Sequence, residues 1–286
     1  MDLDLRLVRA FVAVAEEEHV GRAAERLYLS QPGLTKQIRR LEGVLGVRLV
    51  ERQGRGIRLT PAGEAFVVEA RSLLRRAERA VAAARRAARA HGGEVLVGFV
   101  PPIPGPVSVR LAELDVPLEL RRVDWHRRGE LLGGGEIDLY LLPLPIGPGP
   151  FRHIVLWREP RVAGFPTRHR LAGRSELSID ELAEEPIVDL PTHREYWCVD
   201  PRPDGRSPRY GPLVHSVEEM LEVVSQGRAM CITSASVAEF YRPPGVVFVP
   251  ILDIAPAEFA VVWHPDHLTD AAAEVRRRLA PSPETS

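Results

Sequence analysis

The stretch of sequence that decides the fold is residues 30–46, SQPGLTKQIRRLEGVLG. It opens with Ser30, a residue type that caps helix N-termini well, and Pro32 falls in the first helical turn, where its missing N–H costs nothing. The apolar residues recur at helical spacing and predict one buried stripe, formed by Leu34, Ile38 and Leu41. The stretch therefore predicts a capped helix that ends near Gly46.

The outward face of this predicted helix carries polar and cationic side chains, namely Gln31, Thr35, Lys36 and Arg39. In a helix-turn-helix, the second helix enters the major groove of DNA, and residues near its N-terminus reach base edges. An amide suits adenine, and cations suit guanine or phosphate. The methyl group of Thr35 and the ring of Pro32 suit a thymine methyl. The pattern predicts a helix that reads DNA.

The flanking residues predict the rest of a winged helix-turn-helix within residues 1–60. Two earlier segments repeat apolar residues at helical spacing on either side of a break at Gly21. Two short apolar runs then flank a glycine-rich tip, which indicates a hairpin with cations at Arg52, Arg55 and Arg58. Such a wing contacts phosphates and positions a domain without reading sequence. Ordinary surface charge explains any one cation equally well, but the succession of helices and basic hairpin disfavours that alternative.

A long helix is predicted from Thr60-Pro61 to about Ala90, because no proline or glycine follows Gly63 in that range. Steps of four and three residues separate its seam positions, which are Phe66, Ala70, Leu73, Ala77, Ala80, Ala84 and Ala87. This spacing is the heptad seam of a coiled coil, and it predicts dimerisation through residues 61–91. The alternative is an alanine-rich helix that lies on its own domain.

Composition narrows the class of protein. The 286 residues suffice for two or three compact units, and no apolar run approaches the ~20 residues of a membrane span. No signal peptide is expected, and the two cysteines, Cys198 and Cys231, fit the reducing cytoplasm. Residues 1–91 carry 18 basic and 11 acidic side chains, a net of +7, whereas residues 92–286 have a net of −8. A polyanion is therefore expected to meet only the N-terminal third.

Residues 92–286 follow a hinge at His91-Gly92-Gly93 and alternate between strand-like and helix-like segments. The expected strands are 94–100, 118–123, 137–142, 187–190, 229–233 and 259–263. The expected helices include 217–225 and a final helix at 269–279. Such alternation predicts an α/β architecture of packed layers.

The N-terminal motifs resemble the signature of LysR-type transcriptional regulators. The matching runs are RAAERL at 22–27, SQPGLTKQI at 30–38, LE at 41–42, LG at 45–46, Arg52 and LTPAG at 59–63. The resemblance implies a sequence-specific regulator with a dimerising linker helix at residues 61–90, usually assembled into tetramers. By the same resemblance, bases are contacted by Gln31, Pro32, Thr35 and Lys36, and phosphate is held by Ser30 and Arg39.

Residues 92–286 resemble the effector domain of the same family. The segments that carry this resemblance are residues 135–139, 169–172 and 223–232. The resemblance implies two Rossmann-like subdomains of the periplasmic-binding-protein type, I at about 92–162 and 264–286 and II at about 163–263. The expected crossovers fall near 160–166 and 260–265. A small-molecule effector is expected in the cleft between the subdomains. The cleft positions carried over from the family are Val100, Pro101, Pro102, Ile103, Trp125, His126, Thr192, His193 and Trp197.

The cleft sequence departs from that of relatives that bind small acids. Such relatives often place serine or threonine after the first strand of this domain, where this chain has VPPI at residues 100–103. An anion would find few hydroxyls there. The nearby residues predict instead an aromatic-lined pocket with a few polar groups, built from Trp125, Tyr196, Trp197, His126, His193 and Arg194. The alternative is that these aromatic side chains anchor the core.

Other functions have weaker support. Gly133-Gly134-Gly135 precedes a strand and is better explained as a helix end than as a phosphate loop. No nucleophile motif occurs, so neither enzymatic activity nor a cofactor is predicted. His193, Glu195 and Cys198 match no common metal-ligand spacing, whereas a redox role for Cys198 stays open because His193 and Arg194 are near in sequence. The predicted partners are promoter DNA, an unidentified small molecule, further copies of the chain and, for an activator, RNA polymerase.

Overall fold

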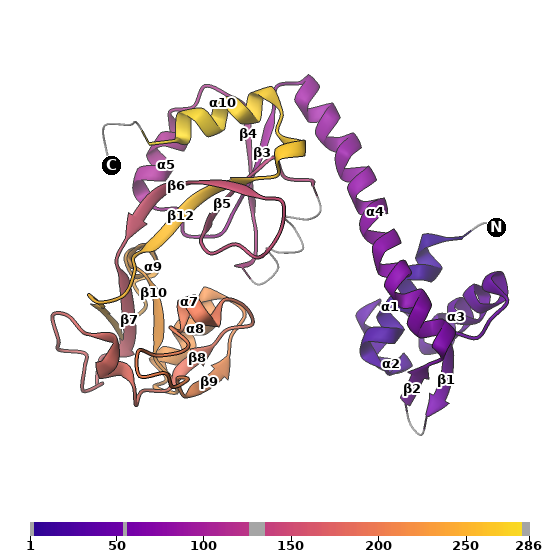
Figure 1. Ribbon diagram of the computed structural model, residues 1–286, viewed down its shortest axis with the longest axis horizontal. Helices are drawn as coiled ribbons and strands as arrows, with labels where there is room; N and C mark the ends of the chain where they lie inside the picture. The colour runs from indigo at the N-terminus through magenta and orange to yellow at the C-terminus, as the bar shows by residue number, and fades with distance from the viewer. Residues whose placement is uncertain (1–2, 54–55, 126–134, 282–286) are drawn as a thin grey trace. The chain divides into compact units, whose positions relative to one another are not determined.

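The computed structural model describes residues 3–53, 56–125 and 135–281 (Figure 1). Contacts within the chain divide it into two compact units, Met1–Ala83 and Ala84–Ser286. Each unit is described by itself. Within the described residues, no helix is both long and apolar enough to span a lipid bilayer.

The first unit is a winged helix-turn-helix, as predicted. Its elements are α1 (Leu5–Glu17), α2 (Val20–Arg26), α3 (Gln31–Leu45), β1 (Val50–Gln53), β2 (Gly56–Leu59) and the beginning of α4 (Pro61–His91). β1 and β2 pair in antiparallel fashion. α3 begins where Ser30 Oγ accepts a hydrogen bond from Gly33 N at 3.2 Å, and it ends at Gly46, whose φ of 71° suits glycine.

The core of the first unit is formed by α1, α2, α3 and α4. The predicted stripe of α3 is buried, and Phe11 of α1 is fully buried with it. α4 contributes its own buried side chains to this core, namely Val67, Ala70 and Leu74. The rings of Phe11 and Phe66 lie 5.5 Å apart. The first turns of α4 are therefore part of the first unit.

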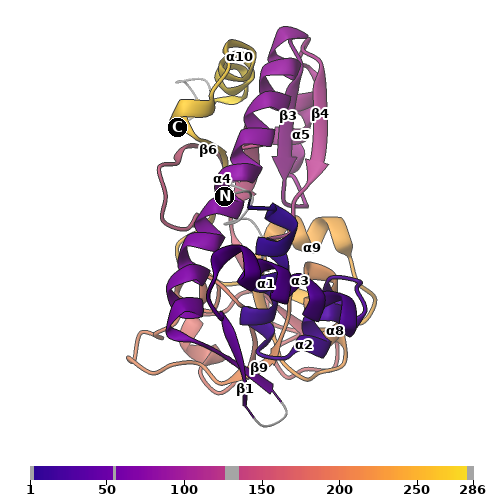
Figure 2. The same ribbon diagram turned by 90° about the vertical axis from the view of Figure 1, so that its right-hand side faces the viewer.

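The second unit contains a five-stranded sheet in the order β4-β3-β5-β12-β6. The strands are β3 (Val95–Phe99), β4 (Leu118–Arg122), β5 (Leu139–Pro143), β6 (Arg152–Glu159) and β12 (Ala257–Trp263). β3 is parallel to β4 and β5, as Figure 2 shows for β3 and β4, whereas β12 is antiparallel to β5 and β6. Alternate residues of β3 and β5 are buried on opposite faces, and α5 (Gly105–Ala112) and α10 (Asp270–Leu279) cover one face (Figure 1).

A second subdomain of this unit is built on a three-stranded sheet in the order β10-β7-β11. β7 (Arg161–Pro166) is central and antiparallel to both β10 (Cys231–Ser234) and β11 (Val246–Pro250). The remaining elements are β8 (Ile187–Asp189), β9 (Tyr210–Leu213), α7 (Arg194–Trp197), α8 (Val217–Ser225), α9 (Ala235–Tyr241) and the 3-10 turn η2 (Ile179–Leu182); η3 (Pro265–His267) follows β12. The predicted α/β architecture with two subdomains is confirmed.

One of the two connections between the subdomains differs from the prediction. The first falls at Pro160, between β6 and β7, inside the expected range of 160–166. The second falls before Ala257 rather than at 260–265, because β12 already pairs with β5 and β6 of the first sheet. An apolar run predicts a buried strand but not the sheet that the strand joins.

Several strands were not predicted, and β7 illustrates the cause. Its sequence, RVAGFP, contains both glycine and proline, which normally weaken a strand. Every residue of β7 is buried. A Cβ at Gly164 would lie 2.7 Å from Cys231 Sγ, so the close approach of the neighbouring strand requires glycine at this position. Packing against the neighbouring strands, rather than the local sequence pattern, therefore determines that this segment forms a strand.

Candidate functional sites

The outward face of α3 presents the side chains that the sequence assigns to base reading. Gln31, Pro32, Lys36 and Arg39 are exposed, and Thr35 is half-buried. Thr35 Oγ1 donates a hydrogen bond to Gln31 O at 2.9 Å, which occupies the hydroxyl and leaves the methyl group for contact. All five side chains line one shallow surface hollow. An amide, a methyl group, an apolar ring and two cations are thereby gathered on one face.

A groove extends from this face toward the wing. Gln31, Thr35 and Arg39 line it together with Arg52 of β1 and with His19. His19 Nδ1 accepts a hydrogen bond from Gly21 N at 3.1 Å and so caps the N-terminus of α2. In a neutral imidazole the proton then sits on Nε2, which makes that atom a donor. The sequence analysis missed His19, since histidine is an uncommon N-cap.

The cations of this surface differ in how far other side chains neutralise them. Within the described ranges, Lys36, Arg39 and Arg52 form no ion pair, whereas Arg58 lies 3.4 Å from Glu51. Lys36 is also the only lysine of the chain. Arg55, assigned to phosphate contact by the sequence, lies outside the described residues. Unpaired, exposed cations are the groups best suited to phosphate.

Glu42 of α3 holds the start of the wing. Its side chain is 7% exposed, and Oε1 accepts hydrogen bonds from Leu49 N at 2.8 Å and Val50 N at 3.3 Å. Arg48 lies 3.5 Å from the other carboxylate oxygen. These bonds fix β1 relative to α3. The residue falls within the family motif but carried no functional assignment in the sequence.

The predicted dimer seam of α4 changes character along the helix. Ala70 is 1% exposed because its own domain buries it, and Phe66 and Leu73 pack against the same core. The alternative of a helix lying on its own domain therefore holds for Ala70, whereas Phe66 and Leu73 stay half-buried and keep part of their surface exposed. Further along, Ala80 and Ala84 are exposed and Ala77 is half-buried. These later seam positions are free of the core of the first unit.

Arginines at the end of α4 tie the helix to the first sheet of the second unit. Arg86 donates a hydrogen bond to Gly135 O, and Arg89 donates one to Glu136 O at 2.5 Å. Arg89 also lies 3.6 Å from the carboxylate of Asp138, which is 2% exposed. Burial raises the pKa of Asp138, against the opposing effect of Leu96 N and Arg89. The end of α4 is therefore held to the first sheet of the second unit by directional contacts.

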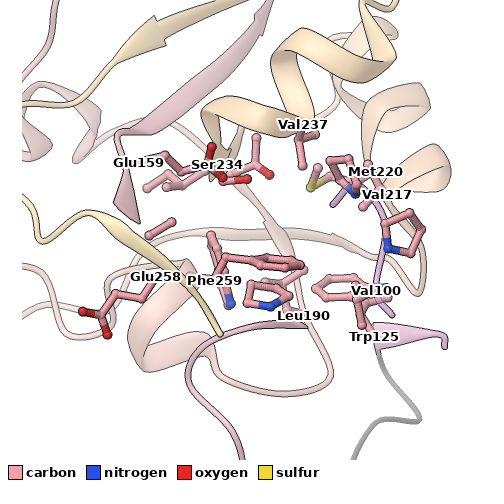
Figure 3. Close-up of a pocket in the computed structure, with 17 residues that line it drawn as sticks. Val100, Trp125, Glu159, Leu190, Val217, Met220, Ser234, Val237, Glu258 and Phe259 are labelled. Atoms are coloured by element: carbon pink, nitrogen blue, oxygen red, sulfur yellow. The ribbon is translucent and has the colours of Figure 1, made fainter. Parts of the chain in front are cut away.

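A pocket lies between the two subdomains of the second unit (Figure 3). Its lining comes from the ends of β3, β5, β6 and β10, from the starts of α8 and α9, and from β12. The lining residues are Val100, Pro101, Pro102, Trp125, Pro143, Glu159, Leu190, Trp197, Val217, Met220, Ile232, Thr233, Ser234, Val237, Ala257, Glu258 and Phe259. Its cavity volume is about 70 Å³, and most of its wall is apolar. A site of this kind at strand ends suits a small ligand.

The sequence-predicted cleft residues divide into those that line this pocket and those that do not. Lining residues from that set are Val100, Pro101, Pro102, Trp125 and Trp197. Ile103 packs under α5 and α10 instead, and Thr192 is exposed on the surface. His193 is absent from the lining among the described residues, and His126 lies outside them. The expectation that the cleft is lined by Ile103, Thr192 and His193 is therefore corrected: these residues do not line this pocket.

The polar groups of the pocket are those that the sequence analysis missed. Glu159, Thr233 and Ser234 are all buried, and Glu159 lies at the end of the unpredicted strand β6. Thr233 and Ser234 carried a usable signal, because they end a predicted strand and ligands of α/β folds bind at such ends. No sequence pattern identified Glu159 as a pocket residue.

Cys198 has the surroundings of a structural thiol. It is fully buried, and Sγ donates a weak hydrogen bond to Val188 O at 3.7 Å. Burial raises the pKa of Cys198 to about 12, more than Arg202 and Arg194 lower it. Redox-active cysteines are exposed and have lowered pKa values. The geometry therefore disfavours the redox role that the sequence left open.

Comparisons with known proteins give matches to both units. Residues 5–64 match the bacterial regulatory helix-turn-helix proteins of the lysR family, and residues 108–281 match the LysR substrate binding domain. The Hca operon transcriptional activator HcaR of Escherichia coli K12 is 36% identical over 297 residues, which cover 97% of this chain and 99% of HcaR. The regulator TfdS of Cupriavidus pinatubonensis is 33% identical over 288 residues, 96% of each chain.

Solved structures resemble the chain over nearly its whole length. The full-length regulator CbnR, in complex with its target DNA, is similar with a TM-score of 0.53 and 26% sequence identity. The alignment covers 98% of this chain and 100% of that chain.

Proposed function

Because this chain belongs to the LysR family, and is therefore a DNA-binding transcriptional regulator with an effector-binding domain, we propose a role for each of its two sites. The α3 face binds promoter DNA, and the pocket between the subdomains binds the effector. The observation that carries the proposal is the pocket itself, since it joins both subdomains around one small cavity. An effector there changes how the subdomains are held, and so changes promoter binding or activation. Action on a promoter also implies a cytoplasmic protein.

Gln31, Pro32, Thr35 and Lys36 are proposed to read bases, with Ser30, Arg39, Arg52 and Arg55 on the phosphates. Exposure of the α3 side chains and the unpaired state of Lys36, Arg39 and Arg52 support these roles. The Gln31 amide matches the paired donor and acceptor of adenine. The similarity to CbnR, which was solved with its target DNA, supports the same face.

Gln31→Ala is expected to weaken binding to the specific site by about 1–3 kcal/mol and to leave binding to random duplex unchanged, because only base contacts carry sequence information. Arg52→Ala is expected to weaken both and to reduce the salt slope by about 0.9. Chromatin immunoprecipitation supplies the operator, and fluorescence anisotropy at several salt concentrations gives the affinities. Equal losses on both duplexes for Gln31→Ala would remove it from base reading.

The effector role of the pocket is tested by filling it. Val217, the first residue of α8, is half-buried and lines the cavity (Figure 3). Val217→Trp is expected to abolish the inducer-dependent change in transcription, because the indole occupies the space of the ligand. Affinity for operator DNA without inducer is expected to stay within about twofold, since the residue belongs to the second unit.

A reporter strain screened with small amines, alcohols and acids supplies the inducer for this measurement. The matched control is Val109→Trp, which makes the same change at an exposed residue of α5 that is not part of the pocket wall. Thermal melting of both variants checks folding. A full response from folded Val217→Trp protein contradicts the assignment of the pocket.

We further propose that the chain forms a homodimer through the later part of α4, where Ala77, Ala80 and Ala84 continue the heptad seam. Dimers then pair into a tetramer, and an activator of this kind contacts RNA polymerase. The family consists of transcriptional regulators. Ligand binding rather than catalysis is therefore the proposed role of the pocket.

A further inference from the structure

The effector pocket contains a buried carboxylate that no described side chain neutralises. Glu159 is 8% exposed, and its Oε2 accepts hydrogen bonds from Ser236 N at 3.0 Å and from the Ser236 hydroxyl. Across residues 3–53, 56–125 and 135–281, Oε1 has no hydrogen-bond donor and the carboxylate has no ion pair. Burying a carboxylate is costly unless it is paired. The wall of the pocket thus holds an acceptor that lacks a partner.

Glu159 also accepts the hydrogen bond from a backbone N–H group that an anionic ligand would otherwise use. Ser236 N belongs to the first turn of α9, and free backbone N–H groups at helix starts are common donors to anions in α/β proteins. In this chain that N–H already donates to Glu159 Oε2. A second carboxylate entering the pocket would meet a like charge close by, which disfavours its ionised form. The pocket is therefore unsuited to small acids.

The remaining walls suit an apolar body. Trp125, Trp197 and Phe259 contribute aromatic rings, and Trp125 Nε1 donates a hydrogen bond to His215 O, so its polar atom is occupied. Glu258 also lines the pocket, but Arg158 Nε lies 2.9 Å from its Oε1, and Figure 3 shows its carboxylate turned outward. The described lining includes no lysine, arginine or histidine. Aromatic faces attract cations.

We propose that the effector is a small molecule with an apolar body and one protonated amine, which donates a hydrogen bond to Glu159 Oε1. The inference rests on the proposed role of the pocket as the effector site. The cavity of about 70 Å³ has room for roughly five water molecules, so the part of the ligand inside it has a few heavy atoms. The amine neutralises Glu159, and the aliphatic part lies against the aromatic rings.

Three probes with the same aliphatic chain test the charge preference. They are n-butylamine, 1-butanol and butyrate, added to the full-length protein at constant ionic strength and neutral pH. Two of the four tryptophans of the chain line the pocket, so intrinsic fluorescence reports binding there. We expect butylammonium to bind about 10- to 100-fold more tightly than butanol, the range of a charge-assisted hydrogen bond, and butyrate to bind weakest.

Glu159→Gln keeps an acceptor for Ser236 and removes the charge. It is expected to reduce the butylammonium affinity to within about threefold of butanol, while the butanol affinity stays unchanged. Glu258→Gln is the matched control, because it removes one negative charge from the same wall and leaves Glu159 unchanged. It is expected to keep the preference of the unmodified protein.

The outcomes separate the two claims. Equal or tighter binding of butyrate, or a preference for the amine that survives Glu159→Gln, overturns the amine inference and leaves the pocket as the effector site. Absence of a saturable fluorescence change with all three probes counts against the pocket itself, and the amine inference falls with it. If Glu159→Gln does not melt cooperatively, the order of the affinities of the three probes for the unmodified protein still tests the amine inference.

Discussion

Gly63→Ala is expected to lower the free energy of unfolding of the DNA-binding unit by about 3 kcal/mol or more, at the upper end of overpacking costs. Gly63 is buried in the first turn of α4, and a Cβ there would lie 2.1 Å from Leu49 O. That carbonyl cannot move aside freely, because Thr60 N donates a hydrogen bond to it at 3.0 Å. The clash thus falls on backbone that connects the wing to α4.

Gly43→Ala is the matched control for this change. Gly43 lies inside α3, and a Cβ there would meet nothing within 4 Å. It is expected to stabilise the unit by about 0.5–1 kcal/mol, since alanine favours the helix and restricts the unfolded chain. Hydrogen exchange of α3 and α4 amides measures the local stability of each variant. Equal protection in Gly63→Ala and the unmodified protein would show that the backbone relaxes, contrary to the prediction.

Local signals explain why the DNA-binding unit was predictable from its sequence. Ser30, Pro32 and the spacing of three apolar residues are all within one segment, and the structure places a capped helix there, Gln31–Leu45. The same holds for α8, where Ser216 Oγ accepts a hydrogen bond from Glu219 N and the apolar period is helical. When capping, period and composition agree, tertiary packing does not need to override them.

The pocket was predictable only in part, because its walls come from segments far apart in the chain. Val100 and Trp125 were expected in the cleft because the resemblance to the family carries the cleft positions onto them, and both line the pocket. Glu159 ends a strand that alternates poorly and lies at the edge of its sheet. The position of its carboxylate depends on Ser236, 77 residues later in the chain, because the N–H and hydroxyl of Ser236 donate hydrogen bonds to it. No periodicity in one segment encodes such a contact.

The α4 seam is a second case in which the sequence pattern was only partly informative. Heptad spacing identifies an apolar stripe but not the surface that covers it. In the first turns, Ala70 packs on the core of its own domain, whereas from Ala77 onward the stripe leaves that core and becomes exposed. The seam that a partner helix would cover is thus about half as long as the pattern suggests.

A double variant, Ala80→Glu with Ala84→Glu, is therefore expected to break the proposed dimer and to weaken binding to a two-half-site operator on the order of 100-fold. Each dimer would bury four carboxylates in a seam of alanines, where desolvation has no compensating cation. Single half-site affinity is expected to change little, because α3 is untouched.

Sedimentation velocity of the full-length protein measures the assembly, and anisotropy with one and two half-sites measures the binding. The matched control is Ala83→Glu with Ala90→Glu, which places the same charges at exposed positions about 80–100° around the helix from the midpoint of Ala80 and Ala84. This variant is expected to stay a dimer and to keep its operator affinity, since its carboxylates remain in water. If both double variants sediment alike, or if the seam variant keeps two-half-site binding, the contact between protomers lies elsewhere than the later turns of α4.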